Sequence, residues 1–366
     1  MKYLFAFGLI MVFLNGCSLT EQQKLNYDSG QVYPANTLPA ALADKYQAML
    51  DKCTANGMPG ITFLIDSPAG FWAGASGYAD VESQSLVSKT SRMKIGSCTK
   101  IYMAVLFIKM AEAGLIGMND MISNYLEPEI LDNIANTRDA TILQLLNHTS
   151  GIPDYLHDIL AGPFDIFNNM TGGGTIREKL KLIYGIPATS VSGTQYSYSN
   201  SGYLLLGLIA EKIYAAPIHI ILQNEIFQPL GLNFTTFDSV GADPAGLTKG
   251  YFSYYLDKTI YDISDLHFYT PDGAIIATTF DVLTFIKSIF TPTFITPTQF
   301  NDMTSSGILT ESPTEPEVSS LYGMGVVETT ENGRIYLHHT GGTFGFTYIY
   351  CYFPVENTYI VLGVNN

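Results

Sequence analysis

The sequence predicts an α/β lobe built from both ends of the chain, with an all-α lobe inserted between them. Strand-like segments occur at 60–66 and 70–78 and return only near the end, at 333–338, 346–353 and 359–364. Helical patterns dominate the long stretch between these two groups. At 366 residues the chain can fill one large core or two lobes. We therefore expect 41–118 with 319–366 to form the α/β lobe and 119–318 to form the mainly helical lobe.

The first 17 residues have the pattern of a lipoprotein signal peptide. Lys2 precedes an apolar stretch, 3–14, that is too short to span a bilayer and fits the core of a secretory signal. Leu14-Asn15-Gly16-Cys17 resembles a bacterial lipobox, whose cysteine carries lipid. We expect 1–17 to direct export to the cell envelope, Cys17 to anchor the protein in the membrane on the periplasmic side, and 18–40 to form a tether. The alternative is cleavage near Gly16, which would release an exported protein without an anchor.

Composition indicates a well-packed globular protein that does not bind nucleic acid. The chain has 18 Lys and Arg against 33 Asp and Glu, and a net charge of −15 would repel phosphate backbones. Charged residues make up 14% of the chain and hydrophobic residues 47%, which excludes a disordered protein. No cluster of cysteines and histidines has metal-site spacing. Cys98 is expected to be a packed thiol, and the sequence leaves open whether Cys53 and Cys351 pair.

Local patterns place the elements in order along the chain. Pro39 suits the first turn of a helix whose apolar residues recur at helical spacing through Cys53. Ser67-Pro68-Ala69 separates the first strands and predicts a hairpin. A short strand then enters a turn at Gly96, and the apolar run 101–113 predicts a helix that is buried all round. An apolar helix follows at 203–213, and a Ser/Thr/Pro/Glu-rich run at 310–320 leads back to the sheet.

Ser97 and Lys100 form the first candidate pair of reactive residues. Because residues three apart share a helix face, the Ser97 hydroxyl and the Lys100 amine should lie close together. A lysine kept neutral by burial can take the proton of a nucleophilic serine, and the N–H groups at a helix N-terminus suit a developing oxyanion. Ser91-Arg92-Met93-Lys94 repeats the spacing, but in an extended run that puts the two side chains on opposite faces. Ser-x-x-Lys is a short pattern and needs partners elsewhere in the chain.

Tyr198 and Asn200 form the second candidate pair, in the segment 196–203 before an apolar helix. Two residues spaced this way on a loop can both point into one cleft. A phenol beside a lysine can relay a proton to a leaving group, and an amide can hold a substrate carbonyl. The alternative is a packed loop with ordinary hydrogen bonds.

The third candidate segment is His339-Thr340-Gly341-Gly342, between two strand-like runs. Glycine lets the backbone of an edge strand approach a ligand closely. His339 at the head of the segment could face a substrate anion as a cation or a hydrogen-bond donor. The alternative is a glycine-rich hairpin turn with a partly buried histidine.

These three motifs, in this order, resemble the serine β-lactamase and penicillin-binding DD-peptidase family. Further blocks are similar as well: Gly77–Asp80, Leu145–Tyr155, Pro229–Leu232 and Tyr322–Gly325. The resemblance covers most of the chain outside the signal and the tether. Tyr-x-Asn points to the branch with class C β-lactamases, DD-carboxypeptidases, D-aminopeptidases and related esterases. Histidine heads the third motif where class C enzymes usually carry lysine, which is more similar to the carboxypeptidase and esterase members.

The resemblance implies a β-lactamase/transpeptidase-like fold, in which helices flank an antiparallel sheet and a helical lobe is inserted. It also implies that Ser97 is acylated, with Lys100 as its base and Tyr198 as the proton shuttle. Asn200 would hold the acyl-side amide of the substrate. The backbone N–H groups of Ser97 and Gly342 would form the oxyanion hole, and His339 with Thr340 would steer the leaving group. The family needs neither a metal nor an organic cofactor for this chemistry.

We therefore expect an exported serine hydrolase that acts on D-amino-acid peptides, like a D-alanyl-D-alanine carboxypeptidase, or on related esters and amides. The partner would be a small molecule or a short peptide, such as a peptidoglycan stem peptide. The alternatives are a class C-type β-lactamase or esterase, and a penicillin-recognising envelope protein without turnover. Gly342 stands where some carboxypeptidases carry a threonine that helps bind the terminal carboxylate. Family members usually continue into a C-terminal helix, and the sequence leaves open whether this chain is truncated or covers that face of the sheet differently.

Overall fold

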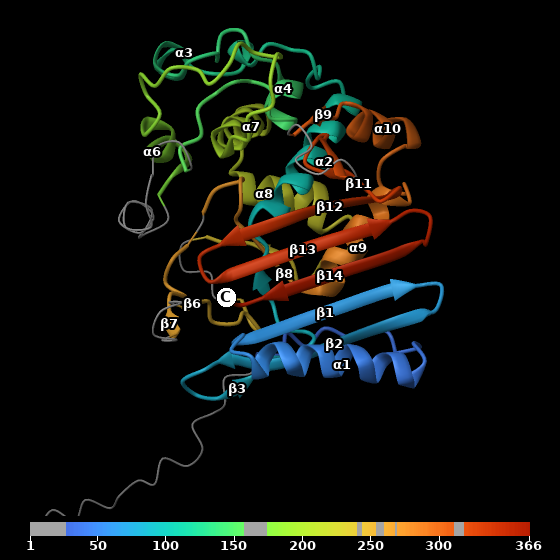
Figure 1. Cartoon of the computed structure of the whole chain (residues 1–366). Coiled ribbons are helices and arrows are strands. Elements are labelled where there is room, and N and C mark those ends of the chain that lie inside the picture. The colour runs from blue at the N-terminus through green and yellow to red at the C-terminus, as the bar shows by residue number, and fades with distance from the viewer. Residues whose placement is uncertain (1–26, 157–173, 240–243, 254–259, 268, 311–317) are drawn as a thin grey trace, which may run out of the picture.

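The computed structural model describes residues 27–156, 174–239, 244–253, 260–267, 269–310 and 318–366. The expected signal peptide with Cys17, and the first part of the expected tether, lie outside these residues. Figure 1 shows a large sheet with a helix across its near side and a group of helices above it.

A single antiparallel sheet combines strands from both ends of the chain, in the order β3-β2-β1-β14-β13-β12-β11-β10-β9. The two ends meet where β1 pairs with β14, with Ile61 opposite Val364. This arrangement confirms the predicted antiparallel sheet. The strands are β1 (Gly60–Ser67), β2 (Gly70–Asp80), β3 (Ser85–Leu86), β9 (Ile308–Leu309), β10 (Val318–Tyr322), β11 (Val327–Glu331), β12 (Arg334–Thr343), β13 (Phe346–Phe353) and β14 (Thr358–Val364).

Apolar side chains cover both faces of this sheet. On one face, helix α1 (Ala40–Ala55) packs with Phe63 and Trp72 in a small cluster. Successive strand residues point to opposite faces, so Leu64 and Ala73 belong to the main core on the other side. Helix α9 (Thr279–Phe290) covers that second face and contacts β1, β13 and β14.

The position of α9 differs from the sequence expectation, which grouped 119–318 in the helical lobe. Val282, Phe285, Ile286 and Ile289 are fully buried and form the face that α9 turns to the core. A helical apolar pattern predicts that a face is buried but does not say against which partner. Strand β9 also precedes the expected boundary at 319 and joins the sheet edge.

The remaining described elements are short helices and small strand pairs. Three strands form a second sheet in the order β4-β8-β5, and β6 pairs with β7. Among the described residues no single helix is long and apolar enough to cross a membrane. One pair of consecutive helices, Asn200–Tyr214 and Ile218–Phe227, reaches the required length and apolar composition together, but the two are bent by 77° relative to each other. The elements are β4 (Met93–Lys94), β5 (Thr236–Phe237), β6 (Tyr251–Ser253), β7 (Ile260–Asp262), β8 (Ile275–Ala277), α3 (Pro128–Asn133), α4 (Ile142–Leu146), α6 (Ile176–Lys181), α7 (Asn200–Tyr214), α8 (Ile218–Leu222), α10 (Pro297–Ser305), and the single turns η1 (Gly96–Cys98), η2 (Ile122–Asn124) and η3 (Gln223–Phe227).

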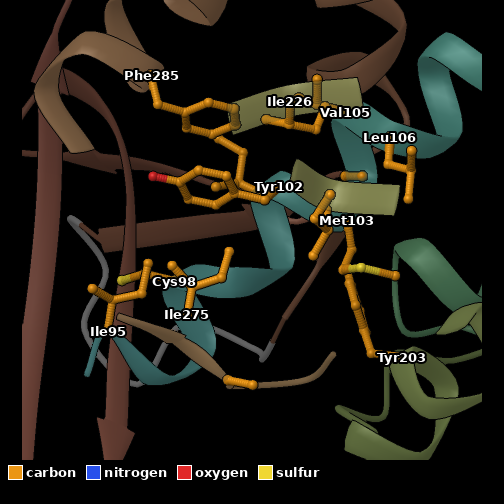
Figure 2. Packing of buried hydrophobic residues seen from close by; sticks show 14 of the residues in the cluster. Ile95, Cys98, Tyr102, Met103, Val105, Leu106, Tyr203, Ile226, Ile275 and Phe285 are labelled. Atoms are coloured by element: carbon orange, nitrogen blue, oxygen red, sulfur yellow. The ribbon is translucent and has the colours of Figure 1, made fainter. Parts of the chain in front are cut away.

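Helix α2 (Thr99–Glu112) forms the centre of the molecule, directly after the turn η1. Every residue from Thr99 to Ile108 is buried, as the apolar run predicted. Tyr102 stacks on Phe285 of α9 with ring centroids 3.6 Å apart, and Met103 and Tyr203 pack on another side of the helix (Figure 2). Core packing on all sides therefore holds the start of α2 in a fixed position.

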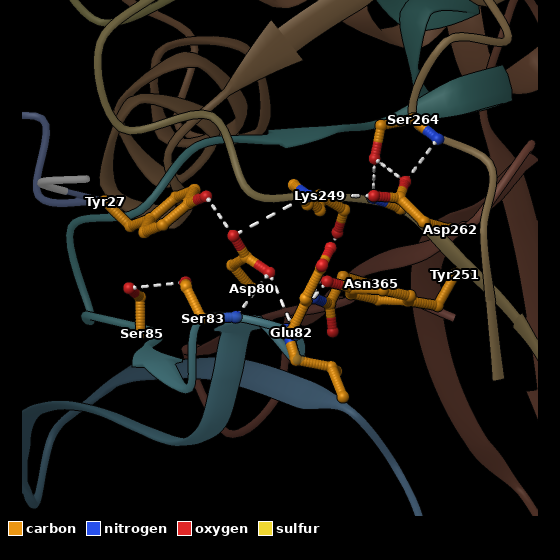
Figure 3. A network of polar contacts seen from close by, with 12 residues as sticks. Tyr27, Asp80, Glu82, Ser83, Ser85, Lys249, Tyr251, Asp262, Ser264 and Asn365 are labelled. Carbon is orange, nitrogen blue, oxygen red and sulfur yellow. Dashed lines mark hydrogen bonds and ion pairs between the residues drawn. The ribbon is translucent and has the colours of Figure 1, made fainter. Parts of the chain in front are cut away.

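A polar network joins segments that are distant in the sequence (Figure 3). Asp80 at the end of β2 accepts a hydrogen bond from the Tyr27 hydroxyl at 3.3 Å and lies 3.6 Å from the Lys249 amine. Lys249 also pairs with Asp262 at 3.0 Å, and its backbone carbonyl accepts a hydrogen bond from the Asn365 amide at 3.0 Å. Because Asp80 is buried, losing the Lys249 amine would leave its carboxylate without a compensating charge. The network therefore fixes both ends of the described chain to the same side of the sheet.

The turn before α2 touches strand β12 through backbone atoms. Gly96 has φ of +52°, and a Cβ there would lie 2.7 Å from the Gly342 carbonyl oxygen. A Cβ at Gly341 would overlap the carbonyl oxygen of Ile95, whereas a Cβ at Gly342 would meet no atom within 4 Å. Glycine at 96 and 341 is therefore what lets β12 lie against the turn that carries Ser97.

Substitution by alanine should affect stability strongly at Gly341 and weakly at Gly342. We expect Gly341→Ala to lower the free energy of unfolding by about 3 kcal/mol, because neither backbone segment can move away from the added methyl group. Gly342→Ala is the matched control and should change it by less than about 1 kcal/mol. Urea unfolding of the two variants measures both values. Equal stabilities would show that the contact between β12 and the turn is looser than described.

Candidate active site

Ser97 and Lys100 meet at the junction of η1 and α2. The helical spacing brings the Lys100 amine to 3.1 Å from the Ser97 hydroxyl oxygen. Lys100 is fully buried, whereas Ser97 is partly exposed. The repeated spacing at 91–94 forms no such pair, because the Ser91 hydroxyl donates to the Tyr27 carbonyl and the Lys94 amine donates to the Leu266 carbonyl.

Tyr198 reaches the same serine from the loop before α7. Its hydroxyl donates to the Ser97 oxygen at 2.9 Å. His148 holds this loop on both sides of Tyr198: its carbonyl accepts from the Ser197 N–H at 2.8 Å, and its Nδ1 accepts from the Ser199 N–H at 3.1 Å. The His148 backbone is left-handed, with φ of +60°, a conformation that non-glycine residues rarely adopt. His148 lies in the family-like block 145–155, but the sequence gave it no role, so this supporting function was missed.

The hydrogen bonds of Lys100 define where its lone pair points. Its amine lies 2.8 Å from the Asn200 side-chain oxygen and 2.8 Å from the Asp272 carbonyl oxygen. Both oxygens can only accept hydrogen bonds. A neutral amine has two N–H groups, and these two acceptors take both of them. The lone pair is then left to face the Ser97 hydroxyl, which is the arrangement that a general base requires.

Burial makes the neutral form of this amine accessible near physiological pH. Desolvation lowers the pKa of Lys100 to about 8, although the carboxylates of Asp272 and Asp154 act in the opposite direction. Burial also raises the pKa of Tyr198 well above its usual value, so its phenol stays protonated. Lys100 is therefore suited to accept the serine proton, and Tyr198 is suited to donate one.

Asn200 is oriented by a buried carboxylate. Its backbone N–H donates to Asp154 Oδ1 at 3.0 Å, and its side-chain nitrogen donates to Asp154 Oδ2 at 3.1 Å. Asp154 belongs to the family-like block 145–155, so the sequence contained a signal for it but no role. Asp272, whose carbonyl contacts Lys100, follows Tyr269-Thr270-Pro271, and that segment gave no signal.

The structure corrects the expected role of His339. Its Nδ1 lies 2.6 Å from the Thr340 carbonyl oxygen, which can only accept, so Nδ1 carries the proton. Its Nε2 then accepts the hydroxyl of Tyr322 at 2.8 Å. Burial, together with the nearby Lys100 amine, lowers the pKa of His339 to about 3, so the ring is neutral. His339 is a packed histidine with both ring nitrogens occupied, and it offers no positive charge to a substrate anion.

The backbone of the third motif nevertheless lies at the site. Gly341 and Gly342 adjoin the Gly96 turn, and a Cβ on Gly96 would lie 2.9 Å from the Gly342 nitrogen. Thr340 and Gly342 are exposed along β12. The segments expected to supply the two oxyanion N–H groups are thus neighbours.

The three cysteines in the described part of the chain form no disulfide. Cys53, Cys98 and Cys351 are all unpaired, which answers the question that the sequence left open. Cys98 is a packed thiol, as predicted, and donates to the His339 carbonyl at 3.4 Å. In the described part of the chain, no group of three or more His, Cys, Asp or Glu side chains is arranged to hold a metal ion.

Comparisons with known proteins identify the family of the chain. A family model described as Beta-lactamase matches residues 42–366. Penicillin-binding protein 4* of Bacillus subtilis is 25% identical over 290 residues, which cover 74% of this chain and 60% of that protein. The chain spans about 60% of the length of the curated relatives that it matches.

Two solved structures share the fold at low sequence identity. A D-stereospecific amidohydrolase from Streptomyces sp. superposes with a TM-score of 0.76 at 24% identity, covering 88% of this chain and 94% of its own. The D-amino acid amidase from Ochrobactrum anthropi SV3, complexed with D-phenylalanine, superposes with a TM-score of 0.77 at 20% identity, covering 89% of this chain and 92% of the amidase chain.

The lone-pair geometry makes the reactivity of Ser97 pH-dependent. Below its pKa of about 8 the Lys100 amine is protonated and cannot accept a proton. The rate at which a fluorophosphonate probe labels the protein should therefore rise with pH and level off above about 8. Lys100→Arg should label at least about 100-fold more slowly, because arginine stays protonated. The measurement is the labelling rate across pH, read by intact-protein mass spectrometry.

Serine variants identify the labelled atom. Ser97→Ala should abolish labelling, whereas Ser91→Ala removes the serine of the repeated spacing and should leave it intact. Labelling that survives in Ser97→Ala, or a rate that falls as pH rises from 6 to 9, would rule out this nucleophile and base.

Proposed function

The chain belongs to the beta-lactamase family of serine hydrolases, and we propose that it hydrolyses amides, short peptides or esters of D-amino acids through an acyl-enzyme on Ser97. The observation that carries the proposal is the pair of hydrogen bonds that turns the Lys100 lone pair toward the Ser97 hydroxyl. A nucleophile, a neutral base and a proton donor then meet at one oxygen atom.

In the proposed reaction, the Ser97 oxygen attacks the substrate carbonyl carbon while its proton passes to Lys100. The negative charge on the former carbonyl oxygen is stabilised by the N–H groups of Ser97 and Gly342. The carbon–nitrogen or carbon–oxygen bond then breaks, and Tyr198 donates a proton to the leaving group and is reprotonated from Lys100. Water attacks the resulting ester while its proton passes to Lys100. The bond between the acyl carbon and the Ser97 oxygen then breaks, and Lys100 returns the proton to that oxygen.

The neutral charge of His339 affects which leaving groups the site can recognise. A DD-carboxypeptidase must recognise a free carboxylate on the leaving group. His339 is neutral with both nitrogens occupied, and Gly342 carries no hydroxyl. Neither position therefore supplies a charged or hydroxyl contact for a carboxylate. The two similar solved structures are a D-stereospecific amidohydrolase and a D-amino acid amidase, which supports a substrate with a neutral leaving group.

A matched substrate panel tests this proposal. An acylated D-Ala-D-Ala peptide, its C-terminal amide and a short activated D-amino-acid ester should all be hydrolysed, and the L-configured ester should be the poorer substrate. We expect free acid and amide to differ by less than about 10-fold in kcat/KM, because neither position 339 nor position 342 offers a hydrogen bond to the carboxylate. One such bond to a charged group would contribute about 1.5–3 kcal/mol, which is about 10-fold or more. A preference of several hundredfold for the free acid would favour the carboxypeptidase instead. Fast turnover of β-lactams with no ester hydrolysis would favour the β-lactamase.

Position 342 offers a control for that panel, because the space around its Cβ is empty. Gly342→Thr adds a hydroxyl there and should shift preference toward the free acid. Gly342→Val has the same shape without the hydroxyl and should not.

We further propose that the protein is exported and anchored through Cys17, a proposal supported by the lipobox-like sequence. A palmitate analogue fed to a bacterial host should label the wild-type chain, and Cys17→Ser should remove the label while Cys53→Ser keeps it. An unlabelled wild type recovered from the medium would favour cleavage near Gly16.

A further inference from the structure

The carboxylate of Asp154 is buried and accepts hydrogen bonds in a fixed pattern. Only 1% of the residue is exposed. Oδ1 accepts from the backbone N–H groups of Asn200, at 3.0 Å, and Leu156, at 3.3 Å. Oδ2 accepts from the side-chain nitrogen of Asn200 at 3.1 Å. A carboxylate can only accept here, so the Asn200 amide must turn its nitrogen to Asp154 and its oxygen to Lys100.

We infer that Asp154 is a positioning residue: by fixing the orientation of the Asn200 amide, it directs the lone pair of Lys100 toward Ser97. This inference rests on the proposed role of Lys100 as the base. If the amide were reversed, its nitrogen would face the lysine and donate to the lone pair. The amine would then direct an N–H, in place of its lone pair, at the Ser97 oxygen. The same atoms would remain in contact, but the base could no longer accept the serine proton.

Replacing Asp154 by asparagine should produce that reversal. The two backbone N–H groups on Oδ1 require an acceptor, so the new side chain keeps its oxygen there and places its nitrogen at the former Oδ2 position. That nitrogen would meet the nitrogen of Asn200, and two donors cannot bond to each other. Rotation of the Asn200 amide removes the conflict, because its oxygen can accept from the new donor. The substitution preserves shape and volume while exchanging the polarity of one atom.

The change in charge provides a second, independent readout. Titratable groups face the Lys100 amine from every element packed around it, and the carboxylates of Asp272 and Asp154 contribute most to favouring its protonated form. Removing one of them lowers the pKa of Lys100 further, so the acid limb of the pH profile should move to lower pH. The groups are Cys98 on η1, His148 and Asp154 on the segment after α4, Tyr198 before α7, Tyr203 on α7, Asp272 before β8, and His339 on β12.

The experiment measures fluorophosphonate acylation of Ser97 across pH in the full chain and in Asp154→Asn, Asn200→Ala and the double variant. Asp154→Asn should lower the plateau rate by about 100-fold or more and move the acid limb to lower pH. In the Asn200→Ala background no amide is left to reverse, so adding Asp154→Asn should change the plateau by less than about threefold.

Asp281→Asn is the matched control. Asp281 is also buried and accepts from a side-chain amide, that of Gln31, and from the backbone N–H of Phe234, but it lies on α9. Its charge is not among those that act on Lys100. The control should retain its plateau rate within about threefold in folded protein, checked by thermal unfolding.

The outcomes separate the inference from the proposed function. A wild type that is not acylated at Ser97 would overturn both. A wild type that is acylated, with Asp154→Asn at the same plateau, would overturn the inference alone, even if the acid limb moves. An equal loss from Asp154→Asn in the presence and absence of the Asn200 amide would also overturn it, because Asp154 would then act independently of Asn200.

Discussion

Removing one amine from water is the constraint on which the rest of this site depends. Lys100 sits on a helix whose first ten residues are all buried, and its carbon stem and amine are enclosed with it. A buried ammonium ion is unfavourable, so the lysine titrates far below an exposed one. The packing of Tyr102 on Phe285 and of Met103 near Tyr203 therefore contributes to the low pKa of Lys100, because it excludes water from this helix.

The two groups of segments that form the site are brought together by different means. The turn at Gly96 and strand β12 touch through backbone atoms, and that contact depends on two glycines. The loop with Tyr198 is held from the side of the helices by His148, whose ring and carbonyl each accept a backbone N–H. Strand β12 and the loop with Tyr198 are thus both held next to Ser97 by direct contacts, the first through backbone atoms and the second through hydrogen bonds to His148.

Sequence patterns predicted the parts of the site that depend on local spacing. Ser97 and Lys100 lie within one helical turn, and Tyr198 and Asn200 lie on one loop, so a short motif contains the relevant geometry. The antiparallel sheet followed from strand patterns at both ends and from the family resemblance. The apolar face of α9 was equally visible, but its partner, the second face of the sheet, was not.

What the patterns could not predict are contacts between distant segments. Whether His339 is charged depends on its burial and on the nearby Lys100 amine, which comes from another segment. Tyr322 of β10 in addition occupies one ring nitrogen. Asp272 contacts Lys100 directly, and Asp154 contacts it through Asn200, both from loops with no reactive motif. Hydrogen-bond direction depends on which atoms meet in space, and a one-dimensional pattern carries no information on that.

The two carboxylates near Lys100 raise its pKa, whereas burial lowers it. The balance between the two effects matters for the proposed reaction. At pH 7 a lysine with a pKa of about 8 is neutral in roughly a tenth of molecules, against less than about a thousandth for a free lysine. Desolvation alone would lower the pKa further and increase that fraction. It would also weaken the base, since the driving force for taking the serine proton falls with its pKa. Asp154 and Asp272 limit the shift, so that the amine is neutral often enough to react and still basic enough to remove a proton. In the proposed mechanism Asp154 thus acts on Lys100 in two ways, through its charge and through the amide that it orients.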